Sequence, residues 1–215
     1  GVRANACAER MCNMAKRTLI VNGSPRPHGN TVALIEEMKK TLEGEVIEIS
    51  AFRSNIAPCV DCRGCVKTAK CVVRDDMDII YADDYDNVVI ATPVYFGTMP
   101  GAMMSLLSRF QPQHAAMFFL DIPRNISPKK AGLILTAGSR KNEDRAMPHV
   151  RCMFNMFNAR GYEGYEVISN NTDEVPADQD EAAMAAARRL GEYLNEDWPE
   201  GADLRDLWDV KRGRA

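Results

Sequence analysis

The stretch TLIVNGSPRPHGNT, residues 18–31, decides the fold class of this chain. It opens on an apolar run typical of a buried strand, and the Gly-Ser-Pro at residues 23–25 ends that run in a turn. Beyond Asn30 and Thr31, which we expect to cap a helix, apolar residues recur at helical spacing as far as Leu42. A strand, a turn rich in glycine and hydroxyl groups, and a helix in this order predict the first unit of a parallel α/β sheet.

The alternation of strand and helix continues through the rest of the chain. Further strands are expected at about 46–49, 87–92, 131–136 and 164–168, with helices after residue 75 and at about 101–110, 145–160 and 180–194. Strands that alternate with helices pair in parallel through right-handed crossovers, which gives a doubly wound sheet. We predict a flavodoxin-like sheet of five parallel strands in the order 2-1-3-4-5, with a ligand crevice at the carboxyl ends of the strands.

Composition and charge exclude several classes of protein. The chain has 215 residues, 46% of them hydrophobic and 27% charged, which is ordinary for a globular protein with a full core. A net charge of −3 lacks the excess of positive charge that is typical of nucleic-acid-binding proteins. No apolar run is long enough to span a membrane. Residues 1–16 form an extension without the apolar segment of a secretory signal, so we expect a cytoplasmic protein. We expect one flavodoxin-like domain at 17–196 and a tail at 197–215.

The turn after the first strand is suited to a phosphate group. Ser24, Asn30 and Thr31 can each donate a hydrogen bond to a phosphate oxygen, and Arg26 can add a charge-assisted one. The first N–H groups of the following helix face the same point. On the residues alone, a plain strand–helix turn with an Asn-Thr cap is the alternative. The turn lacks both the G-x-G-x-x-G pattern and the lysine of a nucleotide-triphosphate loop, so a ligand with one terminal phosphate fits better.

The segment at residues 92–97, TPVYFG, makes a family resemblance specific. The G-S-P-R-x-x-G-N-T turn resembles the phosphate loop of the NAD(P)H-dependent FMN reductase family, and this segment is similar to that family's P-V-Y-x-G segment. The resemblance covers about residues 17–195. It implies FMN as the cofactor, NAD(P)H as an electron donor, and a homo-oligomer, either a dimer or a tetramer. It also implies that the segment borders the flavin ring through Pro93, Val94, Tyr95, Phe96 and Gly97, with one of the two aromatic side chains packed near the ring.

Four cysteines are the most distinctive feature, in the spacing Cys59-x₂-Cys62-x₂-Cys65-x₅-Cys71. Cubane [4Fe–4S] clusters are held by four thiolates, and closely spaced C-x₂-C-x₂-C runs are typical of ferredoxin-type chains. Structural zinc usually takes two separated pairs, so zinc and free thiols are the weaker alternatives. The spacing resembles that of the iron–sulfur flavoproteins, a branch of the same fold family. That resemblance implies that the loop at 57–74 carries a cluster beside FMN.

These patterns predict an FMN-binding oxidoreductase of the iron–sulfur flavoprotein type. The chemistry is expected to belong to the flavin, and no side chain is assigned as an acid, a base or a nucleophile. Asp75 and Asp76 are interpreted as a charged pair at a helix start. A ferredoxin-like donor would supply electrons, and a small molecule would accept them. Two alternatives stay open: an NAD(P)H-dependent flavin or quinone reductase without a cluster, and a metal-binding or regulatory protein with a degenerate flavin site.

Overall fold

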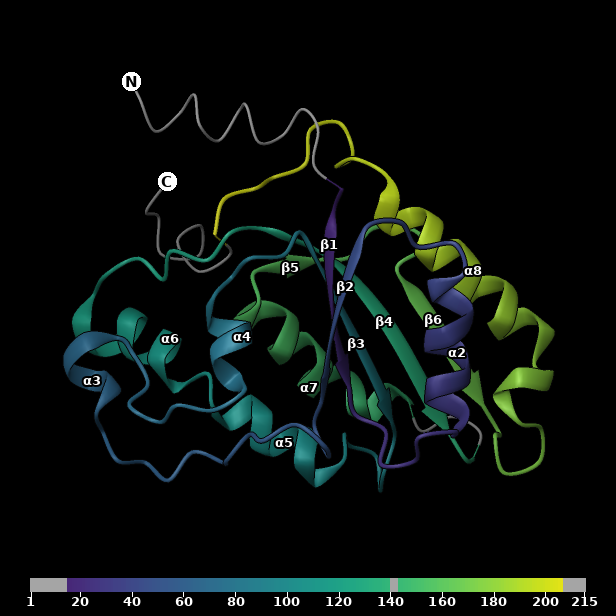
Figure 1. Ribbon diagram of the computed structural model, residues 1–215, viewed down its shortest axis with the longest axis horizontal. Helices are drawn as coiled ribbons and strands as arrows, with labels where there is room; N and C mark the ends of the chain where they lie inside the picture. The colour runs from purple at the N-terminus through teal and green to yellow at the C-terminus, as the bar shows by residue number, and fades with distance from the viewer. Residues whose placement is uncertain (1–14, 140–142, 207–215) are drawn as a thin grey trace.

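One parallel sheet of six strands forms the centre of the molecule (Figure 1). The computed structural model describes residues 15–139 and 143–206. The strands are β1 (Arg17–Asn22), β2 (Glu45–Ser50), β3 (Asn87–Pro93), β4 (Lys129–Ala137), β5 (Ala159–Arg160) and β6 (Glu166–Asn170). Their order is β2-β1-β3-β4, and β4 then pairs with both the short β5 and β6. With β6 in the fifth place, the predicted flavodoxin-like order is confirmed.

Helices cover both faces of the sheet (Figure 1). α2 (Asn30–Lys39) and α8 (Glu181–Asn195) pack on one face, and α4 (Met77–Tyr81), α5 (Gly101–Ser108) and α7 (Glu143–Met156) pack on the other. Successive residues of β1 point to opposite faces of the sheet and therefore enter different cores. Ile20 packs in the core under α2 and α8, whereas Leu19 and Val21 pack in the core under α4, α5 and α7. Strands buried on both faces read as near-continuous apolar runs, which is why β1, β3 and β4 are visible in the sequence. No helix in the described ranges is long and apolar enough to cross a membrane.

Short helical segments form a lobe beside this sandwich. α3 (Cys65–Thr68) lies against α6 (Gln111–Ala115) and against the π-helical turn η1 (Ala116–Leu120), on the side of the molecule away from α2 and α8 (Figure 1). A second short turn, η2 (Ala177–Gln179), precedes α8. The sequence reading expected no element between residues 110 and 131, so α6 and η1 are additions to the predicted plan.

Two predicted boundaries were wrong. The helix expected to reach residue 160 ends at Met156, because Asn158 takes a left-handed conformation (φ 52°) and the next two residues pair with the start of β4. The last strand begins at Glu166 and not at Gly164, since Gly164 has a positive φ of 89° and a turn bond joins Tyr165 N–H to the carbonyl of Tyr162. Both shifts lie at the outer edge of the sheet, where the strands are short.

Candidate functional site

A cavity of about 240 Å³ lies at the carboxyl edge of the sheet, where the loops after β1, β3, β4 and β6 meet. We call it the carboxyl-edge cavity. This edge is where open parallel sheets bind their ligands. Most of the residues predicted to hold the cofactor line this cavity, namely Ser24, Arg26, Asn30, Thr31, Pro93, Val94 and Tyr95. Two loops far apart in the sequence are thus brought to one space, as binding a phosphorylated ring compound requires.

The three buried hydroxyl groups at this cavity, on Ser24, Thr31 and Thr136, already have protein partners. Ser24 Oγ donates to the carbonyl of Arg26 (3.0 Å) and accepts from the N–H of the same residue (3.2 Å), which holds the turn closed. Thr31 Oγ1 lies 2.7 Å from Thr136 Oγ1, so α2 is tied to the end of β4. One of these two threonine hydroxyl groups donates the hydrogen bond between them, and the other keeps its proton available to a ligand. The Arg26 side chain is exposed, and no ionic partner for it is found in the part of the chain that the structure describes.

The predicted helix cap was wrong. Gly29 is the N-cap of α2 and has no side chain to make a capping bond. The amide oxygen of Asn30 instead accepts from the N–H of Ala177 at 3.0 Å. Because this bond occupies the oxygen of Asn30, its NH₂ group is the part available to a ligand. The first turn of α2 consequently lacks a capping side chain, and early helix N–H groups without an acceptor attract anions.

The turn after β3 is rigid and exposes an aromatic ring. The backbones of Tyr95 and Thr98 exchange two hydrogen bonds (2.8 and 3.0 Å), and both residues between them have positive φ, 52° at Phe96 and 79° at Gly97. Positive φ at both central residues is the pattern of a type I′ turn. Phe96 stands at the tip, fully exposed, and neither it nor Gly97 lines the carboxyl-edge cavity. Of the predicted aromatic pair, only Tyr95 borders this space.

The four cysteines gather around a separate cavity of about 40 Å³, the cysteine cavity. Cys59, Cys62, Cys65 and Cys71 all line it and all are free thiols. Burial raises the pKa of the Cys65 thiol, and the charges of the other three thiols raise it further. Within residues 15–139 and 143–206, no three His, Cys, Asp or Glu side chains are placed to hold one metal ion. The arrangement is therefore a thiol-lined cavity and not a closed tetrahedral zinc site.

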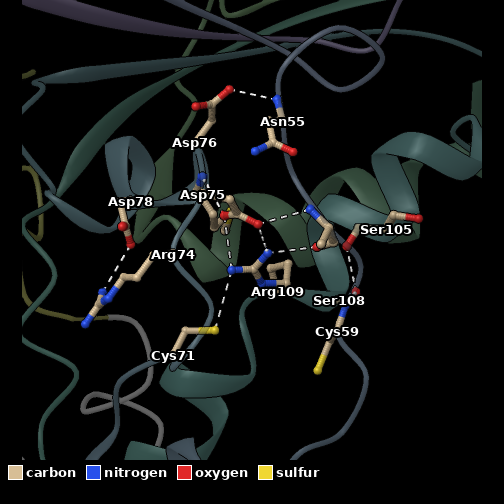
Figure 2. Close-up of polar contacts among 12 residues, drawn as sticks. Asn55, Cys59, Cys71, Arg74, Asp75, Asp76, Asp78, Ser105, Ser108 and Arg109 are labelled. Carbon is tan, nitrogen blue, oxygen red and sulfur yellow. Dashed lines mark hydrogen bonds and ion pairs between the residues drawn. The ribbon is translucent and has the colours of Figure 1, made fainter.

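A buried ion pair fastens both ends of the cysteine loop (Figure 2). Arg109 is 1% exposed and donates to both carboxylate oxygens of Asp75 (2.6 and 3.2 Å), to the carbonyl of Ala57 (2.8 Å), and to Cys71 Sγ (3.5 Å). Asp75 in turn accepts from the N–H groups of Ala57 and Met77, each at 3.0 Å. Burial alone would raise the pKa of Asp75, but the hydrogen bonds from Arg109, Ala57 and Met77 hold it below its usual value. The positive charge of Arg109 thus stands directly beside one of the four thiols.

Further contacts close the base of this loop. Asp76 accepts from the N–H of Asn55 (2.7 Å) and donates its own N–H to the Asn55 carbonyl (3.0 Å), as Figure 2 shows in part. Ser108, at the end of α5, accepts from the N–H of Cys59 at 3.0 Å. The interpretation of Asp75 and Asp76 as a charged pair at a helix start was incomplete. They precede α4, but their carboxylates mainly hold residues on the far side of the cysteine loop.

The two cavities are separate within one chain. They share none of the residues that line them. The cysteine loop leaves the carboxyl end of β2 and runs outward to α3 and α6, whereas the turn after β1 leads directly into α2 (Figure 1). A group held by the cysteines would thus lie on the lobe, to one side of the carboxyl-edge cavity.

Sequence reasoning missed several residues of the two cavities. Thr172 and Asp173 line the carboxyl-edge cavity from the loop after β6. The rule that loops at the carboxyl edge form the site predicts this pair once the last strand is extended to residue 170. Arg109 carries no local signal, because its partners come from another part of the chain.

Known proteins resemble this chain in sequence and in fold. It is 32% identical over 125 residues to an iron–sulfur flavoprotein of Methanocaldococcus jannaschii, a match that covers 56% of this chain and 61% of that protein. It is 30% identical over 127 residues to an iron–sulfur flavoprotein of Methanosarcina thermophila, covering 57% and 63%. The chain therefore spans less than two thirds of the length of these relatives.

A solved structure and a family model complete the comparison. The NAD(P)H:quinone oxidoreductase from Methanothermobacter marburgensis superposes with a TM-score of 0.61 at 13% identity, covering 86% of this chain and 99% of that one, which is a likeness of fold. The family resemblance noted in the sequence is confirmed by a match that extends from β1 to beyond β6. Residues 17–174 fit the model of the NADPH-dependent FMN reductase family, and the chain belongs to that family.

Proposed function

We propose that the protein is an FMN-dependent oxidoreductase of the iron–sulfur flavoprotein type, which passes electrons to a small acceptor. The observation that carries this proposal is the gathering of all four cysteines around one cavity in a chain that belongs to an FMN reductase family. The relatives named iron–sulfur flavoprotein support the same assignment.

The carboxyl-edge cavity is the proposed FMN site. Arg26, the NH₂ group of Asn30 and the first N–H groups of α2 would bind the phosphate. Ser24 and Thr31 would keep the loops at the distance that the phosphate needs, through their bonds to Arg26 and Thr136. The ring would lie along residues 93–95. Bound FMN supplies hydride and single-electron transfer, while the protein binds and orients it.

The cysteine cavity is the proposed cluster site, with Cys59, Cys62, Cys65 and Cys71 as the ligands of one [4Fe–4S] cluster. Arg109 donates to Cys71 Sγ at 3.5 Å, which places a cation beside the proposed ligands. The ion pair with Asp75 keeps this guanidinium in place beside the loop.

We further propose that the protein is a homo-oligomer, either a dimer or a tetramer, and that a ferredoxin-like protein reduces it. Apolar side chains are exposed on the cysteine lobe, at Val60, Val72, Phe118 and Phe119. Clusters of exposed apolar groups favour an interface, and soluble oligomers are usually symmetric. The free thiols agree with a reducing compartment, so the proposed location is the cytoplasm.

An NAD(P)H-dependent FMN or quinone reductase without a cluster is the second candidate. It is favoured by the absence, among the described residues, of three metal-binding side chains placed for one ion. The two candidates share the FMN site and differ only in the use of the four cysteines. One experiment on the whole protein separates them.

That experiment is purification without oxygen, followed by analysis of flavin, iron and sulfide and by EPR of the reduced protein. We expect one FMN per chain and about four iron and four sulfide per chain, as a cubane cluster requires. Cys59→Ala should lose the iron and keep FMN, whereas Cys152→Ala, on the exposed surface of α7, should keep both. FMN without iron would establish the second candidate. Recovery of FAD, or failure to bind FMN, would exclude both.

A further inference from the structure

A third cavity, of about 450 Å³, lies under the cysteine loop and is larger than the carboxyl-edge cavity. Its lining comes from residues 68–71 and Arg74 of the cysteine loop, from four residues between 80 and 85, from eight residues between 112 and 126, and from Phe157. Its volume lies within the range of small-molecule sites, which is roughly 300–1,000 Å³. It shares no lining residue with the carboxyl-edge cavity, and the proposed function assigns it no role.

The inner wall of the third cavity is aromatic. Tyr81, Tyr85 and Phe157 line it together with Ile80. Both tyrosine hydroxyl groups are occupied, since Tyr81 donates to the carbonyl of Arg109 and Tyr85 donates to the carbonyl of Ile80 (3.1 Å). The rings of Tyr85 and Phe157 pack edge to face, with their centroids 6.4 Å apart. Tyr85 and Phe157 are almost completely buried, and the Lys129 ammonium group lies over the Tyr85 ring, so the ring surface that this wall offers to a flat aromatic guest is chiefly that of the half-buried Tyr81.

Two of the charged residues that line the third cavity, Asp83 and Arg124, are already paired within the protein. Its acidic lining residue, Asp83, is held by Lys129 (2.8 Å) and by the N–H of Ser127 (2.8 Å). Arg124 is likewise occupied, by Asp206 (2.6 and 3.0 Å) and by the carbonyl of Asn155 (2.9 Å).

Two cations on the cysteine loop are much less constrained. Arg74 makes one exposed ion pair, with Asp78 at 3.3 Å, and such pairs contribute little. Lys70 is exposed and has no ionic partner in the described ranges. Positive charge therefore remains at the edge that the cysteine loop forms, where it would attract an anion.

We propose that the third cavity binds a planar aromatic anion of one or two rings, with its ring on the tyrosine wall and its charge toward Lys70 and Arg74. Cys71 lines both this cavity and the cysteine cavity. The bound molecule would therefore lie directly against one of the four thiols, on the opposite wall of the cysteine loop. This assignment depends on the residues of the third cavity alone and holds with or without a cluster.

The test compares two probes of one shape and different charge, 1-hydroxy-2-naphthoate and its neutral amide, 1-hydroxy-2-naphthamide. Each is titrated by calorimetry into the whole protein saturated with FMN, and released FMN is followed by absorbance. We expect one naphthoate per chain, bound at least tenfold more tightly than the amide, without release of FMN. Equal affinity for the two probes, or binding that displaces FMN, overturns the proposal.

Variants then locate the bound probe. The double variant Lys70→Glu, Arg74→Glu, which reverses both charges, should lower the affinity for the naphthoate at least tenfold. The affinity for the amide should stay unchanged. The matched control is Lys67→Glu with Arg189→Glu, which changes the net charge equally at exposed positions outside the cavity. Ile122→Trp, at a half-exposed lining position, should block both probes while FMN is retained. If the Lys70→Glu, Arg74→Glu variant loses no more naphthoate affinity than the control variant, the site lies elsewhere. The same conclusion follows if Ile122→Trp still binds both probes.

Discussion

Arg26 brings a cationic side chain to the carboxyl-edge cavity, where its proposed role is to bind the FMN phosphate. A hydrogen bond to a charged group contributes roughly 1.5–3 kcal/mol, so Arg26→Ala should weaken FMN binding about 10- to 150-fold. Turnover should recover once FMN is saturating, since no reacting atom is served by this side chain. Fluorescence titration of FMN measures the affinity, and Arg189→Ala, exposed on α8, is the control. Unchanged affinity with lost turnover would assign Arg26 to the electron donor.

Asp75 is the residue whose ionisation holds the cysteine loop. Asp75→Asn leaves Arg109 buried without its counter-ion, which costs about 3–5 kcal/mol of unfolding free energy at neutral pH. The pKa of Asp75 is lowered in the folded state, so its contribution is complete above the unfolded value of about 3.9 and is lost as the pH falls through the folded value.

The difference in unfolding free energy between wild type and Asp75→Asn should therefore narrow as the pH drops below about 4. Chemical unfolding at a series of pH values measures it. Asp78→Asn, which removes an exposed pair with Arg74, should change stability little at any pH. A constant difference down to the lowest pH would show that the carboxylate charge of Asp75 is not what stabilises the loop.

At the scale of single elements, the turn that follows β3 depends on its glycine. Gly97 has a φ of 79°, and a methyl group there would lie 3.0 Å from Cδ and 3.1 Å from Cβ of Arg145. Gly97→Ala should therefore cost about 1–2 kcal/mol of stability, measured by thermal unfolding. The matched control is Gly101→Ala at the start of α5, where nothing lies within 4 Å. If both variants unfold at the same temperature, the backbone of the turn is not strained by a side chain.

The elements that the sequence predicted well are those whose signal is local. β1, β3 and β4 are apolar runs because both of their faces are buried, and the glycines and prolines beside them mark their ends. The segment at 111–120 carries no such signal. Its π-helical turn leaves Phe118 and Phe119 half exposed, so no apolar periodicity marks it as a helix.

The same distinction applies to the two proposed sites. The turn after β1 could be predicted because a phosphate loop is made by consecutive residues. The partner of Asn30 lies 147 residues away, and a tertiary contact there displaced the local cap that the sequence favoured. The pair of Arg109 and Asp75 spans 34 residues and forms only when α5 packs beside the cysteine loop. A single sequence contains no pattern for such a contact.

Over the whole molecule, Lys130 joins the sheet to the C-terminal helix. Its ammonium group donates to the carbonyl of Tyr193 and to that of Glu196 (3.0 Å), where α8 ends. Burial, and then the nearby charge of Lys16, lower the pKa of Lys130 to about 8. An unfolded lysine has a pKa of about 10.4, so the cost of the buried charge is complete below pH 8 and disappears as the pH rises toward 10.

Wild type should accordingly gain stability relative to Lys130→Met between about pH 8 and pH 10. Chemical unfolding at intervals across this range measures the difference, and the exposed Lys40→Met serves as the control. The comparison with a variant removes the titration of the tyrosines, which is common to both proteins. A difference that does not change with pH would show that Lys130 keeps an ordinary pKa in the folded chain.

The bonds between Asn55 and Asp76 mean that the chain leaves the sandwich and returns to it at one point. Everything between them, including all four clustered cysteines, can be regarded as an insert whose ends already meet. Ser108 and Arg109 bind this insert from outside it, so the insert could be exchanged between proteins of this fold only together with those two side chains. A lineage could thus gain or lose the proposed metal site by a paired exchange of two gene segments, with the proposed flavin site left in place.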